Sequence, residues 1–256
     1  MRGKKFLLIL IIFLLLFSGY SCKKESVVKK TVLIAGTSAN YPPFEYMDDN
    51  NDYVGFDIDL LKLIAVRAGY DEITFVDMNY EDILTSLNEN KIDVAGACIS
   101  ITPDRLKLAD AVEYFTTSHC IMVTKDKDFE PKSLFELSGK RVGVEKGTIG
   151  EEELDFAVLD KTVIDIAISR YTSMDTAMMD LDNDLLDVLI VEGEFGKYYA
   201  SKGNYKISVE FQTESIGFFV KKGNKVLLDK IQKALDIVKK SSDWNNLIEK
   251  YLVIKK

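Results

Sequence analysis

Short apolar, β-branched segments alternate with amphipathic helical segments along most of the chain, and this alternation restricts the possible folds more than any other feature. Parallel strands cannot be connected by a tight turn, so each pair needs a long crossover, which is usually a helix. The pattern therefore predicts an α/β fold in which mostly parallel sheets are flanked by helices.

The predicted segments form two sets, separated by a polar stretch at Lys125–Asp128. In the first set and the closing part, strands are expected at Thr31–Gly36, Ile73–Val76, Ile92–Ala97, Cys120–Thr124 and Ile216–Val220, and helices at Phe56–Ala68, Glu81–Asn88, Thr102–Leu108, Val226–Lys239 and Trp244–Tyr251. In the second set, strands are expected at Arg141–Val144, Val163–Ile166 and Val188–Val191, with one helix opening near Thr148 and another at Ser173–Leu181.

Two sets of βα units that are separated and closed by single strands predict two lobes joined by two crossovers. The first lobe is expected to comprise residues 31–122 and 216–256, and the second lobe residues 123–215. Open α/β sheets bind ligands beyond the carboxyl ends of their strands. We therefore expect the functional site in the cleft between the lobes.

The N-terminus has the pattern of an export signal over residues 1–21. Arg2, Lys4 and Lys5 precede an apolar run at Phe6–Phe17. This run is shorter than the ~20 residues that a membrane-spanning helix needs, and it suits the apolar region of a signal peptide. The chain is therefore expected to be exported.

The signal ends in Ser18-Gly19-Tyr20-Ser21-Cys22, which resembles the lipobox of bacterial lipoproteins, although Gly19 stands where leucine is usual. The resemblance implies that Cys22 is lipidated and that residues 22–30 tether the protein to a membrane, in the periplasm or at the cell surface. An ordinary cleaved signal peptide and an uncleaved N-terminal anchor are the alternatives.

The charge of the chain excludes a broad class of partners. The formal net charge is -8, and removal of the three basic residues of the signal makes the mature chain more acidic still. Nucleic-acid binding depends on basic patches that contact phosphates, so we expect no nucleic-acid partner.

Cysteine and histidine are too sparse for a disulfide scaffold or a zinc site. Cys98 and Cys120 could pair in an exported protein or remain buried thiols. His119 is the single histidine, and the chain has no CxxC or HxxxH pattern, so we expect no metal and no cofactor. His119 is interpreted as a structural residue.

Two strand ends in the expected cleft carry opposite charges. Arg105 lies in the first turn of a helix that Thr102 can cap, where a cation opposes the helix dipole unless an anion binds there. An ion pair with Asp104 or Asp110 is the alternative. Glu192 follows a predicted strand and could hold a cation or be a solvated acid at a helix start.

A third candidate is the loop Glu145–Gly150, which opens a helix. Thr148 and Glu151 form a capping box, which accounts for both without a ligand, yet the glycines leave backbone N–H groups accessible to an anion. Together, Arg105 and the loop N–H groups complement the carboxylate of a free amino acid, and Glu192 complements its ammonium.

Longer motifs carry a family resemblance. Gly55-Phe56-Asp57-Ile58-Asp59-Leu60 leads into a helix, and three further stretches follow the same family order: Tyr41-Pro42-Pro43-Phe44, Ile99–Arg105 and Gly217–Asn224. From about Thr31 to Tyr251, the chain resembles the family 3 bacterial solute-binding proteins, the amino-acid receptors of ABC importers. The resemblance implies a two-lobed, type II periplasmic-binding-protein-like fold with two hinge crossovers.

The resemblance also implies roles for individual residues. Arg105 would grip the α-carboxylate of the ligand with its planar guanidinium, and Ser100 would share that carboxylate. The carbonyl of Cys98 and the side chain of Glu192, in place of the usual aspartate, would receive the ammonium. Ala97 is a weaker candidate.

Other positions bear on the side chain of the ligand. Tyr41 and Tyr80 would flank that side chain, although a core role for Tyr80 is the alternative. Ser38, a weaker candidate, stands where receptors for basic amino acids tend to have an acid, and Glu145 could supply that charge from the other lobe. The preferred ligand is therefore polar or basic.

Two further residues concern the carboxylate subsite. Ile149 replaces a hydroxyl residue and would contribute its N–H, and Thr148 is a weaker candidate. Asp57 and Asp59 resemble a catalytic pair, but their spacing points them in different directions on a helix, and a structural role is expected.

The resemblance implies that the partners are a free amino acid and an ABC permease in the cytoplasmic membrane, and that the protein is a monomer without enzymatic activity. The alternative function is an enzyme that resembles the cyclohexadienyl dehydratases of the same fold, with Glu192 as the acid. Turnover of prephenate or arogenate would distinguish the two.

Overall fold

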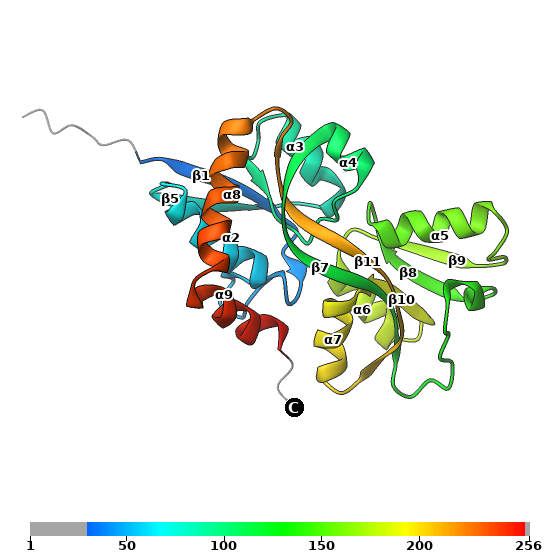
Figure 1. The fold of residues 1–256 in the computed structure, drawn as a ribbon. Coiled ribbons are helices and arrows are strands. Elements are labelled where there is room, and N and C mark those ends of the chain that lie inside the picture. Colours follow the sequence, from blue (N-terminus) through cyan, green and yellow to red (C-terminus); the bar gives the residue numbers. More distant parts are fainter. Residues whose placement is uncertain (1–29, 254–256) are drawn as a thin grey trace, which may run out of the picture. The chain divides into compact units, whose positions relative to one another are not determined.

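The computed structural model describes residues 30–253, so the expected signal peptide and Cys22 lie outside the described residues. The chain forms an α/β fold around one mixed sheet of eight strands, ordered β5-β1-β6-β11-β7-β10-β8-β9 (Figure 1). No helix among residues 30–253 is long and apolar enough to cross a membrane.

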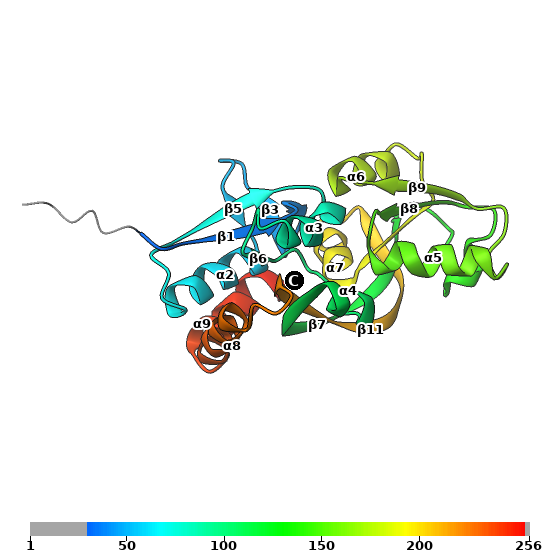
Figure 2. The same ribbon diagram turned by 90° about the horizontal axis from the view of Figure 1, so that it is seen from above.

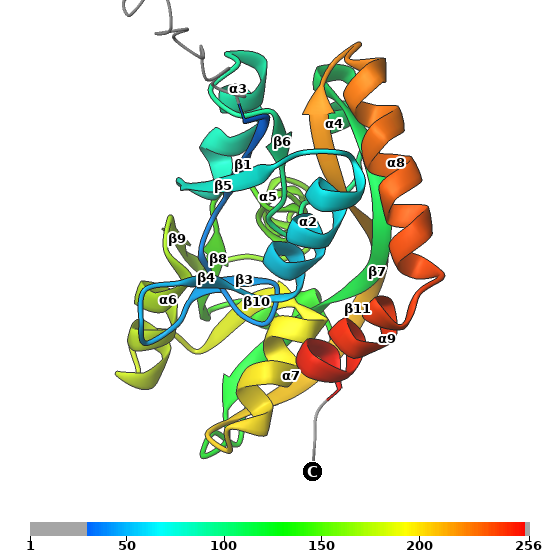
Figure 3. The ribbon, with the colours of Figure 1, turned by 90° about the vertical axis from the view of Figure 1, so that its left-hand side faces the viewer.

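Three strands form one side of the sheet, which we call the first half-sheet: β5 (Glu72–Asp77), β1 (Val32–Thr37) and β6 (Val94–Ala95). β1 pairs in parallel with both neighbours. The helices of this part are α2 (Phe56–Arg67), α3 (Ile83–Asn88), α4 (Pro103–Leu108), α8 (Lys225–Lys239) and α9 (Ser242–Leu247). α2, α8 and α9 pack against one another, as Figure 3 shows.

The other side, the second half-sheet, comprises β10 (Val188–Glu192), β8 (Arg141–Glu145) and β9 (Ala167–Tyr171). These strands are also parallel. Their helices are α5 (Ile149–Leu159), α6 (Met174–Asp182) and α7 (Gly193–Ser201). A compact apolar core forms between β8, β10 and α5 from Val142, Val144, Leu154 and Ile190.

Two long strands connect the half-sheets, and we call them the crossover strands. β7 (Ala109–Thr124) and β11 (Tyr205–Lys221) run antiparallel side by side at the centre of the sheet (Figure 2). β11 pairs with β6 on one side, and β7 pairs with β10 on the other. Every chain connection between the half-sheets therefore passes through these two strands or their ends.

The remaining elements are short. A separate antiparallel sheet contains β2 (Asn40–Tyr41), β3 (Glu45–Met47) and β4 (Tyr53–Val54). Short 3-10 turns lie at Tyr80–Asp82 (η1) and Leu134–Leu137 (η2), and a π-helical turn at Ile248–Leu252 (η3) continues α9.

The sequence-based boundaries fail mainly in the crossover strands. The predicted segments Cys120–Thr124 and Ile216–Val220 cover less than half of β7 and β11. The missing parts contain many half-buried polar residues, because those parts cross between the half-sheets instead of lying inside a core. Their polarity obscures the apolar signal of a strand.

Three other predictions require correction. The predicted strand at Val163–Ile166 is wrong: the strand is β9, whose half-exposed residues give an edge strand little apolar pattern. β6 covers two residues of the strand predicted at Ile92–Ala97. α7 was expected only as a helix start at Glu192 in one alternative, and its extent was not predicted, since Gly193 and Gly196 lower the helix propensity of that segment.

Candidate functional site

Side chains from both half-sheets meet in a narrow buried pocket. It is lined by Ser38, Tyr41, Glu45, Tyr80, Ala97, Cys98, Glu145 and Glu192. The side chains close on one another so tightly that no space for a water molecule remains between them. All of these residues except Glu45 are candidates from the sequence, so the fold brings together seven predicted positions that are far apart in the chain.

Tyr41 and Glu192 join the two sides of this pocket. Tyr41 ends β2 and Glu192 ends β10, and the tyrosine hydroxyl donates a hydrogen bond to the Glu192 carboxylate. The backbone N–H of Glu192 donates to the same hydroxyl at 3.0 Å. The Tyr41 ring also stacks on Phe195 of α7, with the ring centroids 4.3 Å apart. These contacts hold both side chains at the centre of the site.

Arg105 makes a second link between the half-sheets. Its guanidinium donates to the carbonyl oxygens of Ser100 and Gly147, both at 2.9 Å, and lies 5.7 Å from the centroid of the Tyr80 ring. Thr102 caps the helix as predicted, by accepting a hydrogen bond from the Arg105 N–H. The cation is therefore aimed into the seam between the half-sheets.

The alternative interpretation of Arg105 as half of a local ion pair is wrong. Asp104 pairs with Lys107, and Asp110 pairs with Lys222. The Arg105 side chain is instead buried and bonded to neutral carbonyl groups. A buried guanidinium that lacks a carboxylate among its bonded partners is suited to receive an anion, because an anion would compensate its lost hydration.

Ser100, Ile149 and Thr148 lie next to the pocket and do not line it. The Ser100 hydroxyl is buried and has no hydrogen-bond partner among the described residues. Ile149 is buried at the start of α5. Thr148 caps α5 by accepting from the Glu151 N–H at 3.3 Å, and it donates to the Glu145 carbonyl at 2.7 Å. The Thr148 half of the predicted capping box therefore forms, whereas the Glu151 carboxylate accepts from the Gly147 N–H at 2.7 Å and not from the Thr148 N–H.

The pocket is strongly acidic. Glu45, Glu145 and Glu192 are each at most 5% exposed. Burial and the charge of Glu192 hold the pKa of Glu145 well above its usual range, and burial and Asp57 do the same for Glu45. One carboxylate oxygen of Glu45 and one of Glu145 have no hydrogen-bond partner among the described residues. This arrangement favours a cation, which would let these acids ionise.

Glu45 was missed by sequence reasoning, although a signal was present. Glu45 directly follows the Tyr41–Phe44 motif, and it is the one acid in a run of otherwise apolar and aromatic residues. The structure buries its carboxyl. In the strand pattern alone, an acid beside Tyr46 and Met47 suggests an exposed position. The short β2–β3–β4 sheet turns Glu45 inward.

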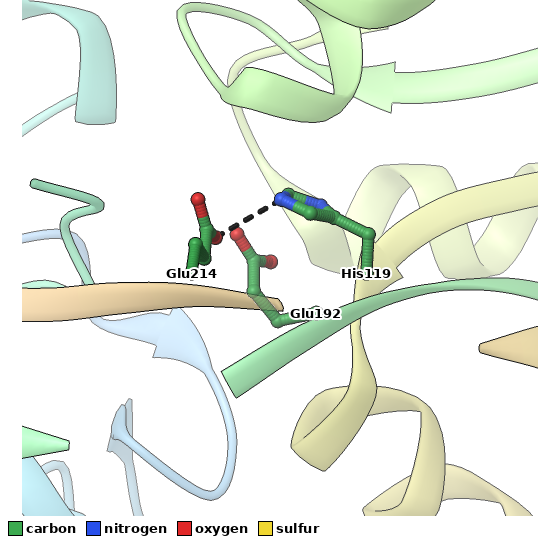
Figure 4. Close-up of side chains that lie close together, drawn as sticks. All are labelled: His119, Glu192 and Glu214. Atoms are coloured by element: carbon green, nitrogen blue, oxygen red, sulfur yellow. Dashed lines mark ion pairs between the residues drawn. The ribbon is translucent and has the colours of Figure 1, made fainter. Parts of the chain in front are cut away.

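His119 and Glu214 were also not predicted as neighbours of the site. His119 on β7 forms an ion pair with Glu214 on β11, with Nε2 and Oε1 3.0 Å apart. Donor atoms of His119, Glu214 and Glu192 all lie within 4.8 Å of one another (Figure 4). A divalent cation could use this donor set, but the ion pair already engages two of its members. His119 is therefore buried beside a candidate binding residue.

Cys98 and Cys120 are buried free thiols, which decides between the two alternatives left by the sequence. The N–H of Cys98 donates to Asp57 at 3.0 Å, and the Tyr114 hydroxyl donates to the same carboxylate oxygen at 2.7 Å. Asp59, in contrast, pairs with Lys250. The two aspartates have different partners, consistent with separate structural roles.

A larger hollow of about 580 Å³ lies along the same seam between the half-sheets. Its lining includes Ala39, Asn40 and Pro42 on one side and Thr172, Ser173 and Asp175 on the other. The chemistry of the site nevertheless lies in the narrow pocket, because that is where the buried carboxylates and Tyr41 converge.

Comparison with known proteins identifies the chain's relatives. The family model described as bacterial extracellular solute-binding proteins, family 3, matches residues 33–254. The arginine-binding extracellular protein ArtP of Bacillus subtilis (strain 168) is 31% identical over 97% of this chain and 98% of its own length.

Two solved structures show the same fold. An ancestral arginine-binding protein bound to arginine superposes with a TM-score of 0.81, at 34% identity over 88% of this chain and 99% of the other. An ancestral amino-acid-binding protein, AncCDT-1, described as a precursor of cyclohexadienyl dehydratase, has a TM-score of 0.79 and 30% identity, over 88% of this chain and 96% of the other. These similarities confirm the predicted two-lobed α/β fold.

Proposed function

Because this chain belongs to the family 3 bacterial extracellular solute-binding proteins, we propose that it is a receptor for basic amino acids, with arginine as the first choice. These relatives are named as arginine-binding proteins, and the one from Escherichia coli is named as an ABC transporter arginine-binding protein. The relatives named for transport are binding proteins and not enzymes. The proposal concerns the side chain that the pocket accepts and the residues that select it.

The buried acids carry this proposal. Three glutamates, Glu45, Glu145 and Glu192, line this pocket, and the buried cation Arg105 bonds across the seam to the Gly147 carbonyl. A neutral or acidic ligand would leave at least one of these carboxyls buried without a compensating charge, which is costly unless the group stays protonated. A ligand with two cationic groups and one carboxylate matches the set.

We assign the α-carboxylate to Arg105 and Ser100. Arg105 can present a planar fork of donors, and the unpartnered hydroxyl of Ser100 lies beside it. The adjacent N–H of Ile149 and the cap residue Thr148 complete this side from the second half-sheet.

We assign the α-ammonium to Glu192 and to the backbone around Ala97 and Cys98. The side-chain cation of the ligand is assigned to Glu145 and Glu45, which supply from other positions the charge that Ser38 lacks. The rings of Tyr41 and Tyr80 would flank its aliphatic part.

Binding requires the half-sheets to separate. Tyr41 bonds to Glu192 and Arg105 bonds to the Gly147 carbonyl, so the groups assigned to the ligand are now engaged with each other across the seam. An amino acid would replace these contacts. We infer a hinge motion about β7 and β11, with lobes at residues 31–122 plus 216–256 and 123–215.

The test is calorimetry with arginine and citrulline, because citrulline has nearly the same shape but a neutral side chain. Wild-type protein should bind arginine at least ~30-fold more tightly, since a buried charge pair contributes ~2–5 kcal/mol. Glu145→Gln should weaken arginine binding and leave citrulline binding within about threefold, whereas the exposed control Glu249→Gln should change neither.

Equal affinity of the wild-type protein for arginine and citrulline would refute the assignment to basic side chains. Loss of both ligands in Glu145→Gln, with an unchanged unfolding temperature, would show that Glu145 supports the pocket and does not select charge. Membrane attachment through Cys22 and a monomeric state remain parts of the proposal that mass spectrometry and ultracentrifugation can test.

A further inference from the structure

His119 lies where both crossover strands meet the candidate ammonium subsite. It sits on β7, directly opposite Glu192 of β10 and Phe211 of β11 in the strand register. Glu214, also on β11, faces the same space. Figure 4 shows the Glu192 carboxylate beside the Glu214 carboxylate, with the imidazole of His119 directed at both.

The packing fixes the imidazole in this position. His119 is 1% exposed, Glu192 is 5% exposed and the Glu214 side chain is 9% exposed. The His119 ring stacks on Phe211, with centroids 5.9 Å apart, while Nε2 lies 3.0 Å from the Glu214 carboxylate. The imidazole therefore has little freedom to leave the two acids.

Two carboxylates this close, and this deeply buried, would share one proton if nothing compensated their charge. A shared proton would leave Glu192 partly neutral and poorly suited to an ammonium ion. An imidazolium between the two acids removes this conflict, because one positive charge faces two negative charges. The cluster then keeps a net charge of -1 with both carboxylates ionised.

The surroundings of His119 favour its protonated form. The acids that face it come from three elements: Glu192 of β10, Glu214 of β11 and Glu153 of α5. Burial alone lowers the pKa of His119, but these carboxylates outweigh burial and raise it to about 9. For Glu192 the effects have the opposite signs: burial raises the pKa of this carboxyl, and the positive charge of His119 lowers it.

We propose that His119 is a positioning residue of the ammonium subsite: held by Glu214 on the neighbouring crossover strand, it keeps Glu192 ionised and aimed at the α-ammonium of the ligand. This inference rests on the proposed amino-acid-binding function. It makes the two crossover strands part of the recognition site, since His119 belongs to one and Glu214 to the other.

The first test separates the ammonium subsite from general packing. Calorimetry would compare L-arginine with 5-guanidinopentanoate, which is arginine without its α-ammonium. His119→Gln should weaken arginine binding about tenfold or more, the equivalent of one pKa unit, and change binding of the analogue by less than about threefold. In addition, His119→Gln should release about one more proton than wild type when arginine binds. The number of protons released is measured from the dependence of the binding enthalpy on the ionisation enthalpy of the buffer.

A matched double variant tests the shared proton directly. In His119→Gln/Glu214→Gln, Glu192 no longer competes with a second carboxylate, so arginine affinity should recover and the extra proton release should disappear. Equal weakening of both ligands by His119→Gln, or no weakening, would overturn the proposal. The proposal would also be overturned if the wild-type protein bound Zn²⁺, if Zn²⁺ tightened arginine binding, and if His119→Gln abolished Zn²⁺ binding. The cluster would then be a metal site.

A second measurement stays valid even where the variants fold poorly. The chain has a single histidine, so NMR of untagged wild-type protein reports the His119 imidazole without overlap. The ring should be protonated at pH 7.5, and a neutral ring at that pH would refute the inference. Wild-type protein that binds no amino acid while His119 is protonated would contradict the proposed function and leave the charge state of the cluster established.

Discussion

Replacement of Arg105 by alanine is the sharpest test of how the site recognises a ligand. The guanidinium is buried, makes two hydrogen bonds of 2.9 Å to carbonyl groups on opposite sides of the seam, and is 8% exposed as a residue. In the proposed complex it pairs with the ligand carboxylate. Arg105→Ala leaves that carboxylate buried without its cation.

The expected loss is ~2–5 kcal/mol, the range for truncation of one partner in a buried, hydrogen-bonded charge pair. This corresponds to an affinity for arginine that is lower by about 30-fold to several thousand-fold. Arg105→Lys should lose less, since it keeps the charge but not the planar fork of donors.

Calorimetry with agmatine provides the control, because agmatine is arginine without the carboxylate. Wild-type protein should bind agmatine weakly, and Arg105→Ala should weaken that binding no further. Circular dichroism should show that the variant is folded. An Arg105→Ala protein that binds arginine as tightly as wild type, or that loses arginine and agmatine to the same extent, would refute the assignment of Arg105 to the carboxylate.

Two further predictions concern stability. Burial raises the pKa of Asp57 to about 7, although hydrogen bonds from Tyr114 and Cys98 lower it. The folded protein therefore holds a proton that the unfolded chain releases near pH 4. The free energy of unfolding should fall as the pH rises from about 4 to 7. Asp57→Asn should make that decline shallower in urea unfolding of ligand-free protein, and an unchanged slope would contradict the burial argument. Gly55 has a φ of 128°, and a Cβ there would overlap the backbone of Phe44, so Gly55→Ala should cost at least ~2 kcal/mol. Gly69→Ala is the matched control, since Gly69 also has a positive φ, of 85°, but open space around it; equal losses in urea unfolding would show that backbone conformation alone accounts for the effect.

The motif Gly55–Leu60 illustrates what local sequence can predict. Gly55 precedes α2, and Asp57 and Asp59 lie in its first turn, where acids complement the helix dipole. The structure gives the two aspartates different partners, Tyr114 with Cys98 for one and Lys250 with Tyr251 for the other. The prediction that they are not a catalytic pair required only the geometry of a helix.

The candidate site shows both the reach and the limit of such reasoning. Arg105 and Glu192 stand at element ends, where capping residues and strand boundaries mark them, and the structure places them near the same seam. Glu45 has no signal beyond its place after the Tyr41–Phe44 motif, and Glu214 has none. Each is an acid in a strand, which ordinarily faces solvent; the short β2–β3–β4 sheet turns Glu45 inward, and pairing of β11 with the distant β7 covers the Glu214 side chain.

The sequence by itself determined the alternation of strands and helices, the helix caps and the cations and anions at element ends, because these depend on residues within a few positions of one another. The tertiary structure alone decided the length of β7 and β11, the inward turn of Glu45 and the meeting of His119 with Glu192 and Glu214. The length of β7 and β11 and the meeting of His119 with the two acids arise from pairing between strands that lie up to about a hundred residues apart, and the local β2–β3–β4 sheet turns Glu45 into a pocket that distant segments complete. No local pattern encodes which strands will be neighbours.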